Sequence, residues 1–169
     1  MRVRLRPMTE AEYDGFARSR RRDYAAQIAA GGDVSPADAR EKADHDLASI
    51  LPRGRATDGH LFLRAEDEAG EPVGHLWLAL CGPGGARASA WVYDVWVERA
   101  LRGRGFGRAI MEAAEREARR HGLGRIGLNV FGYNAAAIGL YRSLGYHVSA
   151  MQMTKPIAAA AAGGDELGE

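Results

Sequence analysis

Hydrophobic positions recur along the chain with two different periods, and the changes of period divide it into strands and helices. A period of two is typical of strands with one buried face, and it predicts strands over residues 2–6, 60–66, 72–80, 89–97, 125–132 and 146–155. A period between three and four is typical of amphipathic helices, and it predicts helices over residues 9–30, 35–49, 105–122 and 134–144. The order of these elements predicts a mixed α/β sheet of six strands with four helices.

Capping residues define the expected helix ends. Thr9 with Glu12 makes a capping box, and Ser35 precedes a proline that suits the first turn of a helix. Asn134 is a good N-cap residue for the last helix, and Gly122 is a good stop for the one before it. The helices are therefore expected to start and stop at these positions.

Composition narrows the class of protein. The chain has 169 residues, 46% of them hydrophobic, which fits one domain with its own core. A net charge of +1 gives no general attraction to nucleic acid or membranes, and no apolar run is long enough to cross a bilayer. The single cysteine, Cys81, excludes an internal disulfide framework and a cysteine metal cluster.

We therefore expect a soluble, cytoplasmic protein that forms one domain over residues 1–157 and binds neither nucleic acid nor a membrane. The tail over residues 158–169 consists mostly of alanine, glycine and acidic residues, and we expect it to be disordered.

Residues 102–108 read RGRGFGR and lie between a predicted strand and a predicted helix. Glycine adopts backbone angles closed to other residues, and the first N–H groups of a helix lack partners. The segment therefore predicts a backbone cradle for an anion, with arginines around it. A flexible basic surface loop is the alternative, but it would require neither the strand before nor the helix after. A dinucleotide fingerprint is excluded because Arg108 stands where its third glycine belongs.

Two motifs in this order resemble the GCN5-related N-acetyltransferase (GNAT) family. The string V-x-x-x-x-R-x-x-G-x-G, from Val97 to Gly107, is similar to that family's pyrophosphate loop. The stretch NAAAIGLYRSLGY, residues 134–146, is similar to its N-x-x-A-x-x-L-Y-x-x-x-G-F signature, with Tyr146 where phenylalanine is usual. The resemblance covers residues from about 1 to 155. It is closest to a bacterial branch with two helices after the first strand and an LP-G--T--H stretch, here residues 51–60.

The resemblance implies a mainly antiparallel GNAT sheet of about six to seven strands, flanked by about four helices and splayed at its central strands. It implies acetyl-CoA as co-substrate, with its pantetheine arm paired to the backbone of Val95, Trp96 and Val97. The pyrophosphate would lie in the loop made of Arg102, Gly103, Arg104, Gly105, Phe106, Gly107 and Arg108. Asn134 would either contact the co-substrate or simply cap its helix.

The resemblance also implies catalytic roles. The family uses the tyrosine at the position of Tyr141 as the acid that protonates the departing CoA thiolate; a tyrosine packed on the core face is the alternative. Many relatives carry a general base on the strand of the V-x-V segment, and Asp94 is the candidate here, beside Tyr93. A hydrogen bond to loop backbone is its alternative role, and a bulge would decide which face it takes. His60 and His75 are interpreted as structural histidines, although both could titrate near neutral pH.

The implied activity is transfer of an acetyl group to an amine of a small molecule or peptide, by direct attack in a ternary complex. A non-catalytic acyl-CoA-binding or sensor domain is the alternative, and the presence of Tyr141 argues against it. No metal site is expected. A homodimer is left open.

No motif names the amine acceptor. The helices over residues 9–30 and 35–49 are expected to wall its site. Arg18, Arg20, Arg21 and Arg22 are interpreted as a solvated helix face, with contact to an acidic acceptor or to a CoA phosphate as the alternative.

Overall fold

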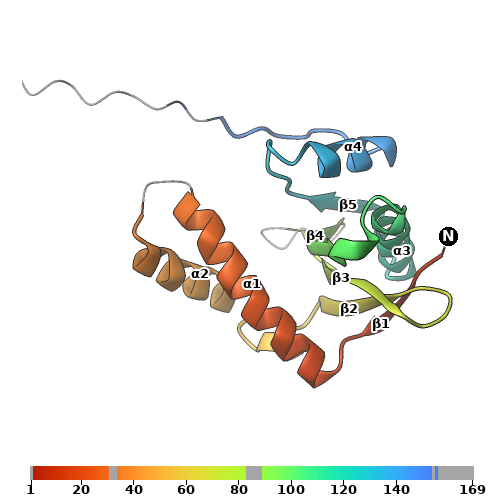
Figure 1. Cartoon of the computed structure of the whole chain (residues 1–169), viewed down its shortest axis with the longest axis horizontal. Helices are drawn as coiled ribbons and strands as arrows, with labels where there is room; N and C mark the ends of the chain where they lie inside the picture. The colour runs from red at the N-terminus through yellow and green to blue at the C-terminus, as the bar shows by residue number, and fades with distance from the viewer. Residues whose placement is uncertain (1, 31–33, 83–88, 154, 156–169) are drawn as a thin grey trace, which may run out of the picture.

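The computed structural model describes residues 2–30, 34–82, 89–153 and 155. They form a five-stranded sheet in the order β1-β2-β3-β4-β5, in which the first four strands are antiparallel and β5 is parallel to β4 (Figure 1). The strands are β1 (Arg4–Pro7), β2 (His60–Glu66), β3 (Pro72–Ala79), β4 (Ser89–Val97) and β5 (Arg125–Leu128). The helices are α1 (Glu10–Ala30), α2 (Pro36–Ile50), α3 (Phe106–Arg120) and α4 (Ala135–Ser143), with 3₁₀ turns at Gly54–Ala56 and Arg99–Leu101.

The two faces of the sheet carry different layers. One face packs against α3 in a core that contains Leu76, Leu78, Ile110 and Met111, all fully buried. The other face packs against α1 and α2 around Phe16, Phe62, Trp77 and their aromatic neighbours. Figure 1 shows the two layers on opposite sides of the sheet, and α4 beside β5. The predicted mixed α/β fold is therefore confirmed.

The predicted caps form hydrogen bonds at the expected helix starts. Glu12 Oε2 accepts from the Thr9 backbone N–H at 2.8 Å, and Thr9 Oγ1 accepts from the Glu12 N–H at 3.3 Å. Ser35 Oγ accepts from Asp38 N–H at 3.2 Å. The hydrogen bond from Arg6, together with the Thr9 N–H, lowers the pKa of Glu12 to about 2. The first helix is thus tied to the first strand by an ionised carboxylate.

A β-bulge at Tyr93 decides which way the end of β4 faces. Trp77 of β3 lies opposite Asp94, whereas Leu78 lies opposite Val92, so that Tyr93 is the extra residue. Ala90 and Val92 face α3 before the bulge, and Val95 and Val97 face it afterwards. The bulge therefore places Asp94 on the opposite face, toward α1 and α2.

The splay expected at the centre of the sheet begins at this bulge. The pairing of β4 with β5 runs from Ser89 to Val92 only, and residues 94–97 pair with β3 alone. A bulge bends and twists its strand, so the end of β4 turns away from β5. The backbone of Val95, Trp96 and Val97 therefore lies on an open edge.

The strand predicted over residues 146–155 is wrong for the residues that the structure describes there, 146–153 and 155. They follow α4 as irregular backbone. The strand predicted over residues 125–132 also ends early, at Leu128. Alternation shows which side chains one face could bury, but a strand also needs a neighbour with free backbone groups. The described sheet accordingly has five strands, fewer than the six to seven expected.

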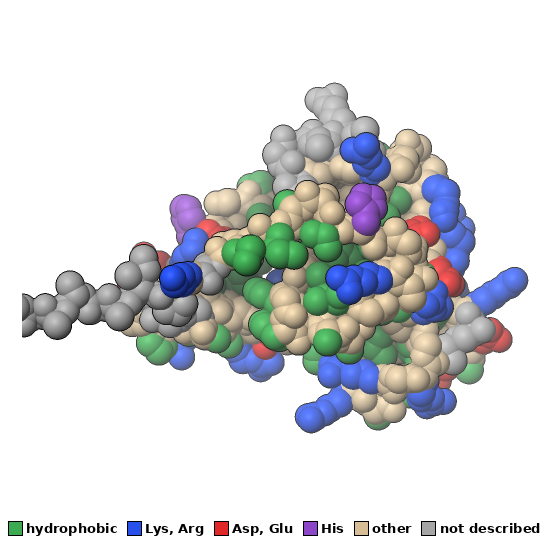
Figure 2. Space-filling view, turned by 90° about the horizontal axis from the view of Figure 1, so that it is seen from above, with side chains coloured by type: hydrophobic (Ala, Val, Ile, Leu, Met, Phe, Trp, Pro, Cys, Tyr) green, Lys and Arg blue, Asp and Glu red, His purple; other side chains and the backbone are tan. Residues whose placement is uncertain are grey.

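Large hydrophobic side chains of this region remain on the surface: Val130, Phe131, Tyr133, Val148, Met151 and Met153. Figure 2 looks onto the side with α4 and shows hydrophobic side chains gathered there. The predicted tail, residues 158–169, lies outside the described residues.

Candidate active site

The loop after β4 presents backbone N–H groups without partners. Within the described chain, none of the N–H groups of residues 103–108 donates a backbone hydrogen bond of normal geometry. Gly105 is the N-cap of α3, with φ 88°, and Gly103 has φ 74°. These left-handed conformations favour glycine and turn successive N–H groups toward one side. The loop therefore has the geometry of an anion cradle at the positive end of a helix.

Gly107 serves close packing at the same corner. A Cβ atom on it would lie 3.2 Å from Leu140 Cδ2 and 3.8 Å from Val97 Cγ2. A side chain there would push apart the start of α3, the end of β4 and α4. Because Gly107 has no side chain, these three elements can meet beside the loop.

The three loop arginines have different neighbours. Arg102 lies with its guanidinium carbon 4.2 Å from the centre of the Trp96 ring, and its Nε donates to the Val97 carbonyl at 3.2 Å. Arg108 Nη2 donates to Ser143 Oγ of α4 at 2.6 Å. Arg104 lies over the Phe106 ring. Arg102 thus covers the open edge of β4, and Arg108 ties α3 to α4.

Asn134 and Tyr141 lie at opposite ends of α4. Asn134 Oδ1 accepts from the Ala137 N–H at 3.2 Å, so the side chain does cap the helix. Tyr141 is buried against the α3 core, with its ring 5.8 Å from that of Tyr146. Burial raises the pKa of Tyr141, and the negative charge of Asp94 raises it further. The hydroxyl therefore keeps its proton at neutral pH.

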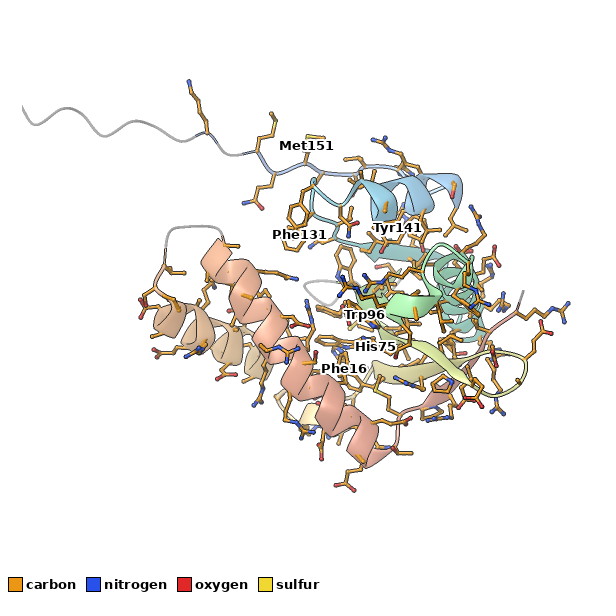
Figure 3. All side chains as sticks on the ribbon, viewed as in Figure 1. Phe16, His75, Trp96, Phe131, Tyr141 and Met151 are labelled. Carbon is orange, nitrogen blue, oxygen red and sulfur yellow. The ribbon has the colours of Figure 1, made fainter. Side chains whose placement is uncertain are left out.

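Asp94 is held by a histidine of the neighbouring strand. His75 Nε2 lies 2.8 Å from Asp94 Oδ2, and both side chains are mostly buried. The His75 ring in turn meets the Phe16 ring of α1 edge to face, with centres 5.2 Å apart. Figure 3 shows Phe16, His75 and Trp96 one above another, with Tyr141 beyond them. The loop-backbone role considered for Asp94 is thus replaced by a contact with His75.

Sequence reasoning missed this pair because the two residues lie on different strands. Only the register of β3 against β4, with its bulge, reveals that His75 and Asp94 share a face. The resemblance to the GNAT family was the signal that identified Asp94, and it gave no partner for the carboxylate.

His60 has a different, structural partner. Trp77 Nε1 donates to His60 Nδ1 at 2.9 Å, which places the proton of the neutral ring on Nε2. Burial lowers the pKa of His60. The Tyr93 ring stacks on Trp77 at 4.5 Å, and Thr57 Oγ1 accepts from the Arg53 N–H at 3.0 Å. The LP-G--T--H stretch therefore shapes the loop and floor below α1 and α2.

The described part of the chain contains neither a cluster of metal ligands nor a helix that could span a membrane. No three histidine, cysteine, aspartate or glutamate side chains come together there as metal ligands. None of the described helices has the length and apolar character needed to span a membrane.

Comparison with known proteins agrees with the fold and motifs. The family model described as "Acetyltransferase (GNAT) family" matches residues 21–146. The uncharacterized N-acetyltransferase YdgE of Bacillus subtilis is 29% identical over 93% of this chain and 99% of its own. The crystal structure of the putative acetyltransferase YycN, also from B. subtilis, has a TM-score of 0.83 and 26% identity, and the match covers 93% of this chain and 99% of YycN.

One shorter match has a named substrate. The L-methionine sulfoximine/L-methionine sulfone acetyltransferase of Pseudomonas aeruginosa is 34% identical over 56% of this chain and 55% of its own length. The family model spans most of the chain, and relatives that match over almost their whole length are named as N-acetyltransferases. The chain belongs to the GNAT family of acetyltransferases, whose co-substrate is acetyl-CoA.

Proposed function

We propose that the protein transfers the acetyl group of acetyl-CoA to an amine in a single ternary complex, with Asp94 as general base and Tyr141 as general acid. The observation that carries the proposal is the placement of these two side chains. Asp94 lies on the end of β4 that pairs with β3 but not with β5, and its charge acts on the Tyr141 hydroxyl of α4. An acid and a base on either side of one open strand edge suit a reaction that removes one proton and delivers another.

The chain's own groups divide the reaction between them. Acetyl-CoA supplies the thioester carbonyl. The N–H groups of residues 103–108 bind its diphosphate, and the edge of residues 95–97 that lacks a β5 partner aligns its pantetheine amides. These contacts hold the co-substrate along the splay and leave room for the acceptor on the side of α1 and α2.

Proton transfer then balances as follows. Asp94 accepts one proton from the acceptor ammonium, and the neutral nitrogen attacks the carbonyl carbon. As the C–S bond breaks, Tyr141 gives its phenolic proton to the sulfur and regains one from the new amide nitrogen. The products are the N-acetyl compound, CoA thiol and one proton, which leaves Asp94 for solvent.

His75 acts in this scheme as a positioning residue. Its Nε2–H donates to Asp94 Oδ2 and leaves Oδ1 available to the acceptor. A non-catalytic acyl-CoA-binding domain would need the phosphate loop but neither this pair nor a tyrosine hydroxyl near it. The P. aeruginosa relative, named for amino-acid derivatives, supports a small amine as acceptor. The cytoplasmic location and the homodimer remain predictions.

Two measurements test the proposal. Thiol release from acetyl-CoA is followed with a panel of amines: polyamines, aminoglycosides, amino acids and short peptides. Calorimetry then compares acetyl-CoA binding by the wild type and by Gly105→Val, which cannot adopt φ 88° without strain. We expect at least about tenfold weaker binding in this variant.

Gly124→Val is the matched control, because Gly124 is exposed, has no positive φ and lies outside the loop. Equal acetyl-CoA affinity in all three folded proteins would contradict the role of the loop. Tight acetyl-CoA binding without thiol release by any amine would favour the binding-domain alternative.

A further inference from the structure

The open edge of β4 presents the backbone groups of two residues, Val95 and Val97. In the register with β3, Val97 lies opposite Gly74, and the next residue, Glu98, donates its N–H to the Val73 carbonyl at 2.9 Å. Antiparallel partners alternate between hydrogen-bonded and non-hydrogen-bonded pairs, so Val97 and Val95 belong to the second kind. Their N–H and C=O groups therefore point away from β3, toward the side that lacks a β5 partner.

The side chain of Arg102 occupies one of these groups. Its Nε donates to the Val97 carbonyl at 3.2 Å. A chain paired along this edge would place an amide nitrogen about 2.9 Å from the same oxygen, so the guanidinium lies where the donor of a ligand amide would lie. Arg102 and a paired ligand therefore exclude each other at this carbonyl.

An aromatic ring holds Arg102 in this position. Its guanidinium carbon lies 4.2 Å from the centre of the Trp96 ring, close enough for a cation–π contact. Glu98, the acid nearest to Arg102 in the sequence, pairs instead with Arg64 of β2 at 3.5 Å. Arg102 is thus held by a neutral carbonyl and a neutral ring, and its charge stays available to an anion.

A ligand that displaces Arg102 from the edge must compensate for the two lost contacts. Arg102 immediately precedes the anion loop, residues 103–108. A hydrogen bond from a guanidinium to a phosphate is stronger than one to a neutral carbonyl, so a diphosphate in that loop would attract the released side chain. A donor with a pantetheine arm but no diphosphate must break the same contacts without this gain.

We infer that Arg102 determines the specificity for the acyl donor: it blocks the edge of β4 against thioesters of pantetheine alone and yields the edge to acyl-CoA, whose diphosphate draws the guanidinium away from Val97 and Trp96. This inference rests on the proposed function, in which the edge aligns the pantetheine arm. It adds a competitor for that edge within the chain itself. The discrimination comes from a contact of the free protein that the wrong donor cannot replace.

The other two loop arginines have no such contact with β4. Arg104 lies over the Phe106 ring within the loop, and Arg108 donates to Ser143 of α4 at 2.6 Å. Neither of these contacts occupies the backbone edge. Arg104 is exposed, as Arg102 is, and therefore serves as the control for loss of a positive charge from the loop.

The test compares two donors in two variants. S-acetylpantetheine lacks the diphosphate that acetyl-CoA carries, and kcat/KM for each is measured by thiol release with one accepted amine. Arg102→Met should raise kcat/KM with S-acetylpantetheine by about threefold to thirtyfold, because the edge becomes free. It should lower kcat/KM with acetyl-CoA, because a charge beside the diphosphate is lost. Arg104→Met should lower the value for acetyl-CoA without raising the value for S-acetylpantetheine.

Trp96→Leu separates the blocking contact from the charge. It removes the ring that holds the guanidinium and leaves Arg102 available to the diphosphate. We therefore expect kcat/KM to rise by about twofold to fivefold with both donors. The Tm of Arg102→Met should stay within a few degrees of the wild type, since the side chain is exposed. A large loss of Tm would give Arg102 a structural role and overturn the inference.

Equal, lower or undetectable kcat/KM with S-acetylpantetheine in Arg102→Met would contradict the inference, as would an equal rise in Arg104→Met. So would a fall with both donors in Trp96→Leu. If acetyl-CoA still supports thiol release in the wild type, the proposed function stands and only the role of Arg102 is wrong. Absence of acetyl-CoA turnover with every amine would instead count against the proposed function, and the inference would fall with it.

Discussion

The two faces of the sheet are built from the same strands, yet they carry different kinds of side chain. The face toward α3 buries Leu76, Ile110 and Met111 completely. The face toward α1 and α2 carries His75 and Asp94 beside its aromatic rings, only partly buried. Leu76 and His75 are neighbours in the chain, so a single strand contributes to both faces.

This difference separates stability from chemistry. Burial of apolar groups on the α3 face stabilises the fold without specific partners. Polar groups on the other face lose hydration and need specific hydrogen bonds, so they add little net stability. Substitution of buried apolar residues such as Leu76 should therefore lower the free energy of unfolding, and substitution of His75 or Asp94 should lower activity. Tyr141 is the informative exception, because it packs with the α3 core and is also the proposed general acid.

The largest expected effect concerns that exception. Tyr141→Phe removes one oxygen and keeps the ring, so packing and acetyl-CoA affinity should be preserved. Loss of a proton donor should lower turnover by about 10²–10⁴-fold with any amine that the protein accepts. Turnover and the acetyl-CoA Kd are measured on one sample. A fall of less than about threefold with intact binding would make Tyr141 a packing residue with water as the acid.

Next is a truncation on the α3 face. Leu76→Ala creates a cavity in a site with 0% exposure and should lower the free energy of unfolding by about 2–5 kcal/mol. Trp96→Ala, three residues after the bulge on the opposite face, is the comparison, because 43% of Trp96 is exposed. Urea denaturation of both variants tests the contrast. Equal losses would mean that the two faces stabilise the fold alike.

A smaller effect is expected from the partner of Asp94. His75→Leu removes the donor to the carboxylate, and kcat should fall by about tenfold to a hundredfold, since a hydrogen bond to a charged group contributes about 1.5–3 kcal/mol. His75→Gln restores a donor and should recover most of kcat, with KM for acetyl-CoA unchanged in both variants. A kcat equally low in both variants, or unchanged in His75→Leu, would exclude the positioning role.

The smallest effect lies at the edge of the α1 face, in the ion pair of Glu12 with Arg6. The pKa of Glu12 in the folded protein, about 2, lies below its ordinary value of 4.5. The stabilisation from the ion pair is therefore present above pH 4.5 and is lost as pH falls toward 2. Glu12→Gln keeps the capping box and should cost about 0.2–1 kcal/mol at pH 7. The difference in unfolding free energy should shrink near pH 3. A difference independent of pH would assign the effect to packing.

Local signals predicted most of the fold. Caps such as Ser35 and Asn134 are read from a few adjacent residues, and their hydrogen bonds form as expected. The strand over residues 146–155 could not be judged in this way, because a strand depends on a neighbour distant in sequence. The left-handed glycines at 103 and 105 and the helix start after them were predictable because they are contiguous in sequence.

The rest of the site depends on register. Alternation cannot place a bulge, so it could not say that Asp94 shares a face with His75. The residues were visible in the sequence, but their partners were not.

The bulge at Tyr93 has a consequence for how this enzyme could have arisen or could be lost. The extra residue bends the end of β4 away from β5, and it puts two consecutive side chains, Tyr93 and Asp94, on the face toward α1 and α2. An in-frame deletion of the Tyr93 codon would restore regular pairing with Asp94 still opposite Trp77, so the carboxylate would keep its face while the bend would be lost. A single genetic event could therefore close the splay without moving the carboxylate, which makes the two features separable.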